Sequence, residues 1–235
     1  MSAPSGSRQV DLNADLGEEI TDDAGLLQIV TSANVACGYH AGSPAVMAEV
    51  CERAAHLGVT IGAHVSYADR ANFGRVAVDV SPDVLREQVA DQLGMLASAA
   101  AAAGVGVTYV KPHGALYHRV GVDEGQAEAV LDATGDLPVL GMPGALILDR
   151  ALVGGRQIRL EGFPDRAYAV DGTLVPRDQP GAVLEDPAAV ADAAVRMAER
   201  VDSLCVHGDT PDAVGIARHV RRRLDEAGWS VESAW

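Results

Sequence analysis

The sequence has little cysteine and a deficit of positive charge. Its three cysteines, Cys37, Cys51 and Cys205, are far apart and form no CxxC pair. An odd number of widely spaced cysteines argues against a disulfide framework and against a cysteine zinc site, and it fits a reducing compartment. With 33 acidic against 18 basic residues, the net charge of −15 repels phosphate backbones and anionic lipid surfaces. We therefore expect no nucleic acid and no membrane as partners.

Long apolar runs are also missing. No stretch reaches the roughly 18 apolar residues that a membrane-spanning helix needs, and no apolar segment typical of a signal peptide follows the polar start MSAPSGSR. A cytoplasmic location is the resulting expectation. The chain has 235 residues, of which 48% are hydrophobic, and this suffices for one large core. We predict a flexible N-terminus over residues 1–8 and a single domain over residues 9–235.

Short apolar runs alternate with helical segments along the chain. The expected strands are residues 9–13, 32–37, 59–63, 107–111, 138–142, 157–161 and 203–207. Three helices begin with a serine or threonine followed by proline and end at a glycine. They run from Ser43-Pro44 to Gly58, from Ser81-Pro82 to Gly104, and from Thr210-Pro211 to Gly228. This alternation predicts a parallel sheet with right-handed crossovers.

Polar residues at the strand ends favour a closed barrel over an open sheet. Strands of a parallel sheet are buried on both faces and should be apolar, whereas barrel enzymes build their sites at the C-terminal ends of several strands. Six of the seven expected strands end in such residues, which are Asp11, Asn13, Asp15, Asn34, His64, Lys111, His113, Glu161, His207 and Asp209. We therefore predict an α/β fold, a seven-stranded parallel (β/α)7 barrel with these side chains at its mouth.

The segment VKPHGALYH, residues 110–118, brings a lysine and two histidines to the end of the fourth strand. The proline after Lys111 removes a backbone donor and holds the lysine extended. A lysine desolvated there requires a lowered pKa or a permanent anionic partner, for which Asp15, Glu161 and Asp209 are candidates. The alternative is a buried ion pair that only fixes the strand register.

The histidines fall into two groups by position. His56 and His219 lie on expected helices and are interpreted as ordinary surface or core groups, and His118 lies beyond the strand and receives no role. Four others lie at or just past strand ends, where a barrel would point them toward one centre. These four are His40, His64, His113 and His207.

Two long polar loops, residues 66–75 and 161–177, add positive charge around this mouth. Long ordered loops in compact folds are usually functional. The loops carry Arg70, Arg75, Arg166 and Arg177. An arginine fork matches a carboxylate or phosphate, so a small anionic ligand is expected. Alternatively, Arg70 and Arg166, which each follow an aspartate, only organise their own loops.

Six segments together resemble the LamB/YcsF family, in the same order and over nearly the whole chain. They are VDLNADLGE (10–18), SANVACGYHAG (32–42), IGAHVSYADRANFGR (61–75), VKPHGALY (110–117), DRAYAVDGTLVPR (165–177) and CVHGDTPDAV (205–214). The resemblance implies a (β/α)7 barrel of the glycoside hydrolase/deacetylase type. It also implies ATP-dependent opening of 5-oxoproline (pyroglutamate) to glutamate, with ATP and Mg as co-substrate and no tightly bound cofactor. The 5-oxoprolinase subunits B and C would then be partners, and a homo-oligomer remains open.

Lactam chemistry assigns roles to these candidates. Phosphorylation of the lactam oxygen turns a resistant amide into a better electrophile. Asp15 or Glu161 is then expected to act as general base toward water, and His113 to pass a proton to the departing ring nitrogen. Lys111 would balance charge on the carbonyl or phosphate oxygen. Substrate binding is assigned to Asn13, Asn34, His40, His64, Arg75, Arg177, His207 and Asp209, with Arg75 preferred for the carboxylate.

Two other functions are compatible with the same residues. No GxxxxGK[ST] or strand-linked GxGxxG is present, so the ATP site is not predicted and partner subunits are candidates for it. Asp15, His64 and His113 have the residue types for one divalent ion with an open water position, as in a metal-dependent deacetylase or hydrolase. Lys111 argues against this, because an ammonium weakens cation binding nearby. A non-catalytic binding protein for a cyclic amino-acid derivative is the third candidate.

Overall fold

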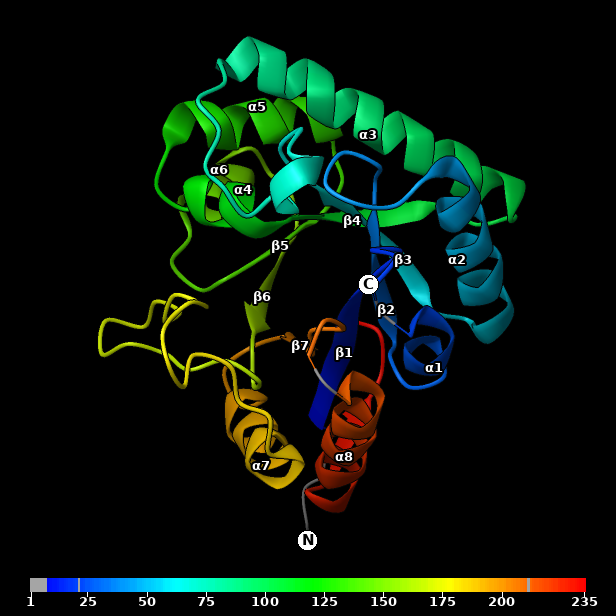
Figure 1. Ribbon diagram of the computed structural model, residues 1–235, viewed down its shortest axis with the longest axis vertical. Helices are drawn as coiled ribbons and strands as arrows, with labels where there is room; N and C mark the ends of the chain where they lie inside the picture. Colours follow the sequence, from blue (N-terminus) through cyan, green and yellow to red (C-terminus); the bar gives the residue numbers. More distant parts are fainter. Residues whose placement is uncertain (1–7, 21, 211) are drawn as a thin grey trace, which may run out of the picture.

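The computed structural model describes residues 8–235 except Thr21 and Pro211, and seven parallel strands close into a barrel within this range (Figure 1). In chain order they are β1 (Arg8–Leu16), β2 (Ser32–Ala36), β3 (Thr60–Val65), β4 (Val107–Pro112), β5 (Val139–Gly141), β6 (Ile158–Gly162) and β7 (Ser203–Cys205). Each strand pairs with the next, and β7 pairs with β1 to close the ring. The predicted seven-stranded parallel barrel is therefore confirmed.

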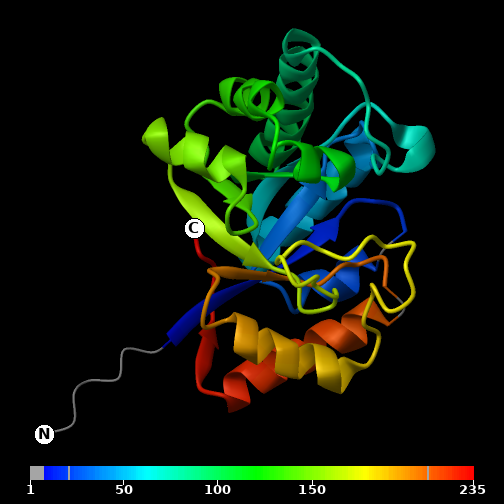
Figure 2. The ribbon, with the colours of Figure 1, turned by 90° about the vertical axis from the view of Figure 1, so that its left-hand side faces the viewer.

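Helices surround the barrel on the outside (Figures 1 and 2). They are α1 (Asp23–Leu27), α2 (Pro44–Leu57), α3 (Pro82–Ala102), α4 (Gly114–Arg119), α5 (Glu124–Thr134), α6 (Leu146–Val153), α7 (Pro187–Met197) and α8 (Ala213–Glu226), with a 3-10 turn η1 (Arg70–Asn72). α3 packs beside α5, and α7 packs beside α8. Across the described part of the chain, no helix combines the length with the apolar character that crossing a bilayer requires.

Two of the three predicted helix starts are confirmed. The side chains of Ser43 and Ser81 cap α2 and α3, and both helices have proline at the first position. The third prediction is wrong, because α8 begins at Ala213 and the Asp212 carboxylate caps it by accepting from the Gly215 backbone N–H. Pro211 itself lies outside the described residues.

The first and last described segments of the chain pack at the N-terminal end of the barrel. A short unpredicted strand, β8 (Trp229–Val231), pairs with the beginning of β1 outside the closed ring. β1 begins at Arg8, one residue before the predicted start of the domain, and residues 1–7 lie outside the described range. The Trp235 ring stacks on Tyr109 at 4.0 Å between centroids. This packing covers one end of the barrel and leaves the C-terminal strand ends for the site.

The barrel interior contains a hydrogen-bonded polar network instead of a purely apolar core. The Asn34 amide donates to Asn13 Oδ1 at 2.7 Å and to Asp15 Oδ1 at 2.9 Å. The Tyr109 hydroxyl donates to Asn34 Oδ1 at 2.6 Å, and Asn13 donates to Ser203 Oγ at 2.7 Å. Buried polar groups require such partners. The network therefore fixes Asp15 from below.

Gly62 in β3 provides the space that the Tyr109 ring fills, and its replacement should destabilise the barrel. A Cβ at Gly62 would lie 2.2 Å from Tyr109 Cζ. We expect Gly62→Ala to lower the free energy of unfolding by about 1–3 kcal/mol or more through overpacking. Gly94→Ala is the matched control, because Gly94 lies in α3 with nothing within 4 Å of an added Cβ. That control should gain about 1 kcal/mol. Urea titration measures both, and equal stabilities would contradict the prediction.

Candidate active site

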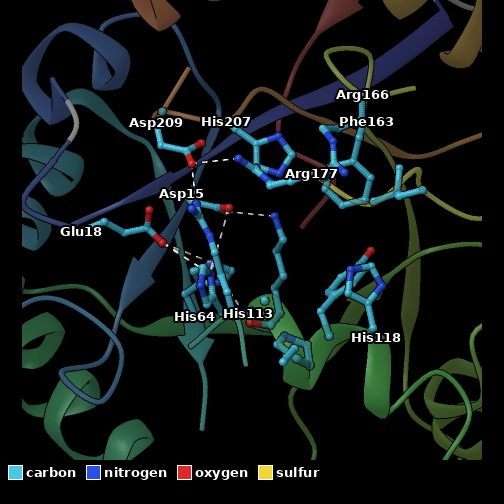
Figure 3. A pocket seen from close by; sticks show the side chains of 18 of the residues that line it. Asp15, Glu18, His64, His113, His118, Phe163, Arg166, Arg177, His207 and Asp209 are labelled. Atoms are coloured by element: carbon cyan, nitrogen blue, oxygen red, sulfur yellow. Dashed lines mark hydrogen bonds and ion pairs between the residues drawn. The ribbon is translucent and has the colours of Figure 1, made fainter. Parts of the chain in front are cut away.

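A cavity of about 400 Å³ opens at the C-terminal end of the barrel (Figure 3). This volume is in the range of small-molecule sites, and the location is where barrel enzymes carry out their chemistry. The predicted site residues that line it are Asp15, His64, Arg75, Lys111, His113, Arg177, His207 and Asp209. Residues from several strands and two loops therefore meet at one place, as the strand-end pattern predicted.

The other predicted site residues lie behind the cavity wall. Asn13 and Asn34 are fully buried in the network below Asp15, so the structure gives them a positioning role in place of the expected direct substrate contact. His40 lies behind Glu18, with 3.2 Å between Nε2 and Oε1. Glu161 is fully buried and is held by protein partners. A general base must reach its proton, which disfavours Glu161 for that role.

Lys111 is a buried ammonium between two carboxylates. Its Nζ lies 2.9 Å from Asp15 Oδ1, 2.9 Å from Glu161 Oε1 and 3.2 Å from Cys205 Sγ. Burial lowers the pKa of Lys111, but the carboxylates of Asp15 and Glu161 outweigh it and raise that pKa well above its ordinary value. Of the anionic partners considered from the sequence, Asp15 and Glu161 therefore pair with Lys111, and Asp209 lies elsewhere.

Asp15 remains ionised despite its burial. Burial raises the pKa of Asp15, but the nearby His64 and Lys111 lower it by more. The pKa of Asp15 therefore lies well below its ordinary value. The register places Asp15 opposite Asn34 and His64 opposite Lys111 on neighbouring strands. Strand pairing thus aligns these groups at one level of the barrel.

Tyr117 and Phe163 complete the wall around the ammonium. The Tyr117 hydroxyl donates to Glu161 Oε2 at 2.9 Å, and burial together with Glu161 raises the pKa of Tyr117 well above its ordinary value. The Phe163 ring centroid lies 5.4 Å from Lys111 Nζ, within the range of a cation–π contact. Tyr117 therefore stays protonated and keeps Glu161 oriented toward the lysine.

Glu18 and three histidines form a second cluster on the adjacent wall, which we call the histidine cluster: Glu18, His40, His64 and His113. Glu18 Oε1 lies 3.2 Å from His40 Nε2, 3.5 Å from His113 Nδ1 and 3.9 Å from His64 Nε2. Burial and the nearby Asp15 raise the pKa of Glu18 to about 7, and burial lowers the pKa of His40 to about 3. Burial therefore keeps the His40 imidazole neutral beside the Glu18 carboxyl group.

The loop after β3 packs directly on the histidine cluster. Phe73 accepts a hydrogen bond through its carbonyl from His113 Nε2 at 2.9 Å. A Cβ on Gly74 would lie 3.0 Å from His113 Cδ2 and 3.0 Å from the Cβ of His40, and Gly74 has a φ of +64°. Only glycine fits this close approach in that conformation. The loop therefore sets the position of the imidazoles.

His207 forms a dyad with Asp165 on the opposite wall. His207 Nδ1 lies 2.9 Å from Asp165 Oδ2, which also accepts from the His207 backbone N–H at 2.9 Å. The ring stacks on Phe163 with centroids 5.3 Å apart. Within the described chain no hydrogen bond occupies the other ring nitrogen, Nε2, so it is available to a molecule in the cavity. This is the arrangement of an oriented acid–base imidazole.

The loop arginines are joined through Asp209. Arg75 and Arg177 donate to the same Asp209 oxygen at 2.5 and 2.8 Å, and they outweigh the effect of burial to keep the pKa of Asp209 below its ordinary value. Arg166 donates to the carbonyls of Ala182 and Val175 at 3.2 and 2.6 Å. Arg166 therefore fits the loop-organising alternative, although it also lines the cavity.

Arg70 makes its contacts outside the cavity. Its guanidinium donates to the carbonyl of Gly42 at 2.7 Å and pairs with Glu19 at 2.6 Å. It is absent from the cavity lining and links two loops beside it. These contacts fit the alternative that Arg70 only organises its own loop.

Sequence reasoning missed Glu18, Asp165 and Tyr117 as site residues. Tyr117 lies four residues after His113, one turn along α4, and this spacing was a usable signal. Glu18 follows Gly17, whose φ of +73° turns the chain after β1 toward the cavity. Asp165 is distant in sequence from His207, and nothing in the local pattern pairs the two.

The fold and this site define the chain as a deacetylase-like (β/α)7 barrel whose titratable groups gather at the C-terminal strand ends. Many proteins belong to that class, and sequence similarity identifies the family within it. The chain belongs to the LamB/YcsF family, whose family model matches residues 10–235. The resemblance of the six sequence segments is thereby confirmed.

Relatives and solved structures agree with this membership. The chain is 54% identical to the A subunit of 5-oxoprolinase from Streptomyces avermitilis, covering 94% of this chain and 98% of the relative. The lactam utilization protein from Thermus thermophilus superposes with a TM-score of 0.89 at 36% identity, covering 95% of this chain and 99% of that chain. A family 4 carbohydrate esterase from Streptomyces lividans shares the fold, with a TM-score of 0.56 at 10% identity over 97% of this chain and 93% of that chain.

Proposed function

We propose that this chain is the A subunit of an ATP-dependent 5-oxoprolinase, which opens 5-oxoproline to glutamate. The observation that carries the proposal is the buried Lys111 ammonium at the wall of a small cavity flanked by arginines. Such a site suits a small anionic substrate on which negative charge develops. The high identity to a relative named as the A subunit of 5-oxoprolinase supports the same assignment.

The proposed reaction divides into activation and hydrolysis. ATP transfers its γ-phosphoryl group to the lactam oxygen and leaves as ADP. Water then adds to the ring carbon, the carbon–nitrogen bond breaks, and the nitrogen takes a proton to become the amine of glutamate. A second water releases the phosphate from the γ-carboxyl group. Phosphoryl transfer and the release of phosphate place negative charge on oxygen, so a fixed positive charge lowers the barriers of these steps.

Lys111 supplies that fixed charge. Its raised pKa keeps it protonated, and its two carboxylate partners hold the ammonium in place before substrate arrives. Asp15 also lines the cavity, and its Oδ1 accepts from Lys111 and Asn34 while its Oδ2 lies 3.5 Å from His64 Nε2. We assign Asp15, in preference to the enclosed Glu161, as the base for the attacking water.

We assign proton transfer to His207 in place of His113. Both nitrogens of His113 face protein atoms, since Nδ1 lies 2.9 Å from His64 Nε2 and Nε2 contacts the Phe73 carbonyl. His207 keeps Nε2 available, and Asp165 fixes its tautomer. Arg177 and Arg75, joined at Asp209, supply positive charge for the substrate carboxylate.

Subunits B and C are the proposed partners, with Mg-ATP as co-substrate. The test measures glutamate release from 5-oxoproline and Mg-ATP with this chain alone, with candidate B and C subunits, and with those subunits alone. The proposal expects glutamate only when all three subunits are present. A folded chain that yields none, with partners verified as active beside another A subunit, would overturn it.

The metal-dependent deacetylase alternative meets an obstacle in this geometry. Its carboxylate ligand would be Asp15, but Lys111 Nζ lies 2.9 Å from Asp15 Oδ1 and competes with a cation there. Likeness to the esterase at 10% identity concerns the fold alone. Release of acetate from an N-acetylated sugar, without ATP or partners, would favour this alternative. Tight binding of 5-oxoproline with no turnover in the complete assembly would favour a binding protein.

A further inference from the structure

The protons on two imidazoles of the histidine cluster are fixed by backbone carbonyls. His64 Nδ1 lies 3.1 Å from the Lys111 carbonyl, and His113 Nε2 lies 2.9 Å from the Phe73 carbonyl. A carbonyl oxygen only accepts, so each of these nitrogens must carry the hydrogen. The opposite nitrogens, His64 Nε2 and His113 Nδ1, therefore present lone pairs in the neutral rings.

These two lone pairs face each other at close range. His64 Nε2 and His113 Nδ1 are 2.9 Å apart and both rings are buried. Two acceptors at this separation repel each other unless a cation lies between them. Either a shared proton or a metal ion would remove the repulsion.

A third donor atom favours the metal ion. Glu18 Oε1 lies 3.5 Å from His113 Nδ1 and 3.9 Å from His64 Nε2, on the same side as their lone pairs. With metal–ligand bonds of about 2.0–2.2 Å in a tetrahedral site, neighbouring donors are about 3.4 Å apart. The three observed separations bracket this value. A proton shared by the two imidazoles would leave Glu18 Oε1 with His40 Nε2, at 3.2 Å, as its nearest partner, whereas a metal ion engages all three donor atoms.

We propose that Glu18, His64 and His113 bind one divalent transition-metal ion at the edge of the cavity. Two imidazoles and one carboxylate suit Zn²⁺ or Co²⁺ and leave an open position, and all three residues line the cavity. Carbonyl partners on the far nitrogens are the usual outer contacts of metal-binding histidines. His40 lies 3.2 Å from Glu18 and is placed to donate to its carboxylate as a further outer contact.

Lys111 does not exclude this ion, because its charge is already balanced. Asp15 and Glu161 each lie 2.9 Å from the ammonium, so the trio carries a net negative charge. That charge attracts a cation to the neighbouring wall. An ion in the open site would act as a Lewis acid toward a carbonyl or phosphoryl oxygen.

The test titrates Co²⁺ into the metal-stripped chain and follows its visible absorption. We expect one equivalent to bind and Zn²⁺ to displace it. Loss of an outer contact lowers metal affinity by about 10–100-fold, so losing a direct ligand should cost at least about 100-fold. Glu18→Gln and His113→Gln should show this loss, and His40→Gln the smaller one. His118→Gln is the matched control, because His118 lines the same cavity outside the cluster and should bind normally.

Circular dichroism establishes that each variant is folded. X-ray absorption on the Co²⁺-loaded parent chain gives a second readout that needs no variant, and it should show two imidazole ligands. No stoichiometric binding, or binding equally strong in Glu18→Gln and His113→Gln, would overturn the site and leave the shared proton. Because none of these measurements uses turnover, their outcome is separate from that of the proposed 5-oxoprolinase activity.

Discussion

Replacing Lys111 with methionine is expected to abolish glutamate formation and to destabilise the fold at the same time. Removing one fixed donor to a developing oxyanion typically costs about 10²–10³-fold in kcat, and Lys111 offers a full charge. The side chain is 2% exposed and neutralises two carboxylates, Asp15 and Glu161. Breaking a buried ion pair by removing one partner costs about 3–5 kcal/mol. The enclosed geometry therefore predicts a loss of stability together with the loss of turnover.

A double variant separates the two effects. Adding Glu161→Gln to Lys111→Met removes one of the unpaired carboxylates, so stability should recover in part while activity stays absent. A double-mutant cycle on urea unfolding should show strong coupling between the two positions. Glu161→Gln alone tests how far the second carboxylate matters for turnover. Full turnover by Lys111→Met in the three-subunit assay would remove Lys111 from the reaction.

The barrel was predictable because its signals are local. Apolar runs, serine caps and proline at the first helical position mark where strands and helices begin, and α2 and α3 obey them. The start of α8 was misplaced because the Thr210-Pro211 pair resembles a helix start, while Asp212, with φ of +54°, makes the cap. β8 has three residues and lies beside β1, so no periodicity could reveal it.

Site residues were predictable where a side chain with suitable chemistry lies at the C-terminal end of a strand. Lys111 and His64 end adjacent strands and reach the cavity as expected. Asn13 and Asn34 do not reach the cavity, because they lie lower in the barrel. There the Asn34 amide donates a hydrogen bond to Asp15 beneath the cavity. A polar residue inside a strand does not reveal its depth, since register between strands is a long-range property.

Local sequence patterns could not predict the contacts between loops. Asp165 and His207 come from different loops and meet only because the barrel brings β6 and β7 together. Glu18 lies just past β1 and joins histidines from three other segments. Such pairs depend on the closed fold, so local patterns indicate the residue types without indicating their partners.

Replacing His207 with glutamine is expected to lower kcat by about 10²–10⁴-fold, the usual contribution of a positioned acid–base group. KM should change little, because Arg75 and Arg177 remain paired through Asp209 and still supply charge for the substrate. The assay is steady-state glutamate formation by the assembled subunits. His219→Gln is the control, since that imidazole lies on α8 and bonds to the Gly215 carbonyl of its own helix.

Asp165 should act through His207, and its variants distinguish orientation from packing. Asp165→Asn retains the size of the side chain but leaves the His207 tautomer undefined, so kcat should fall while the fold persists. Exogenous imidazole should restore part of the activity of His207→Ala when Asp165 is intact, and less when Asp165→Asn is added. A merely structural role would give no such dependence, because added imidazole cannot repair packing. Equal rescue in both backgrounds would therefore exclude the orienting role of Asp165, whereas no rescue in either would return proton transfer to the histidine cluster.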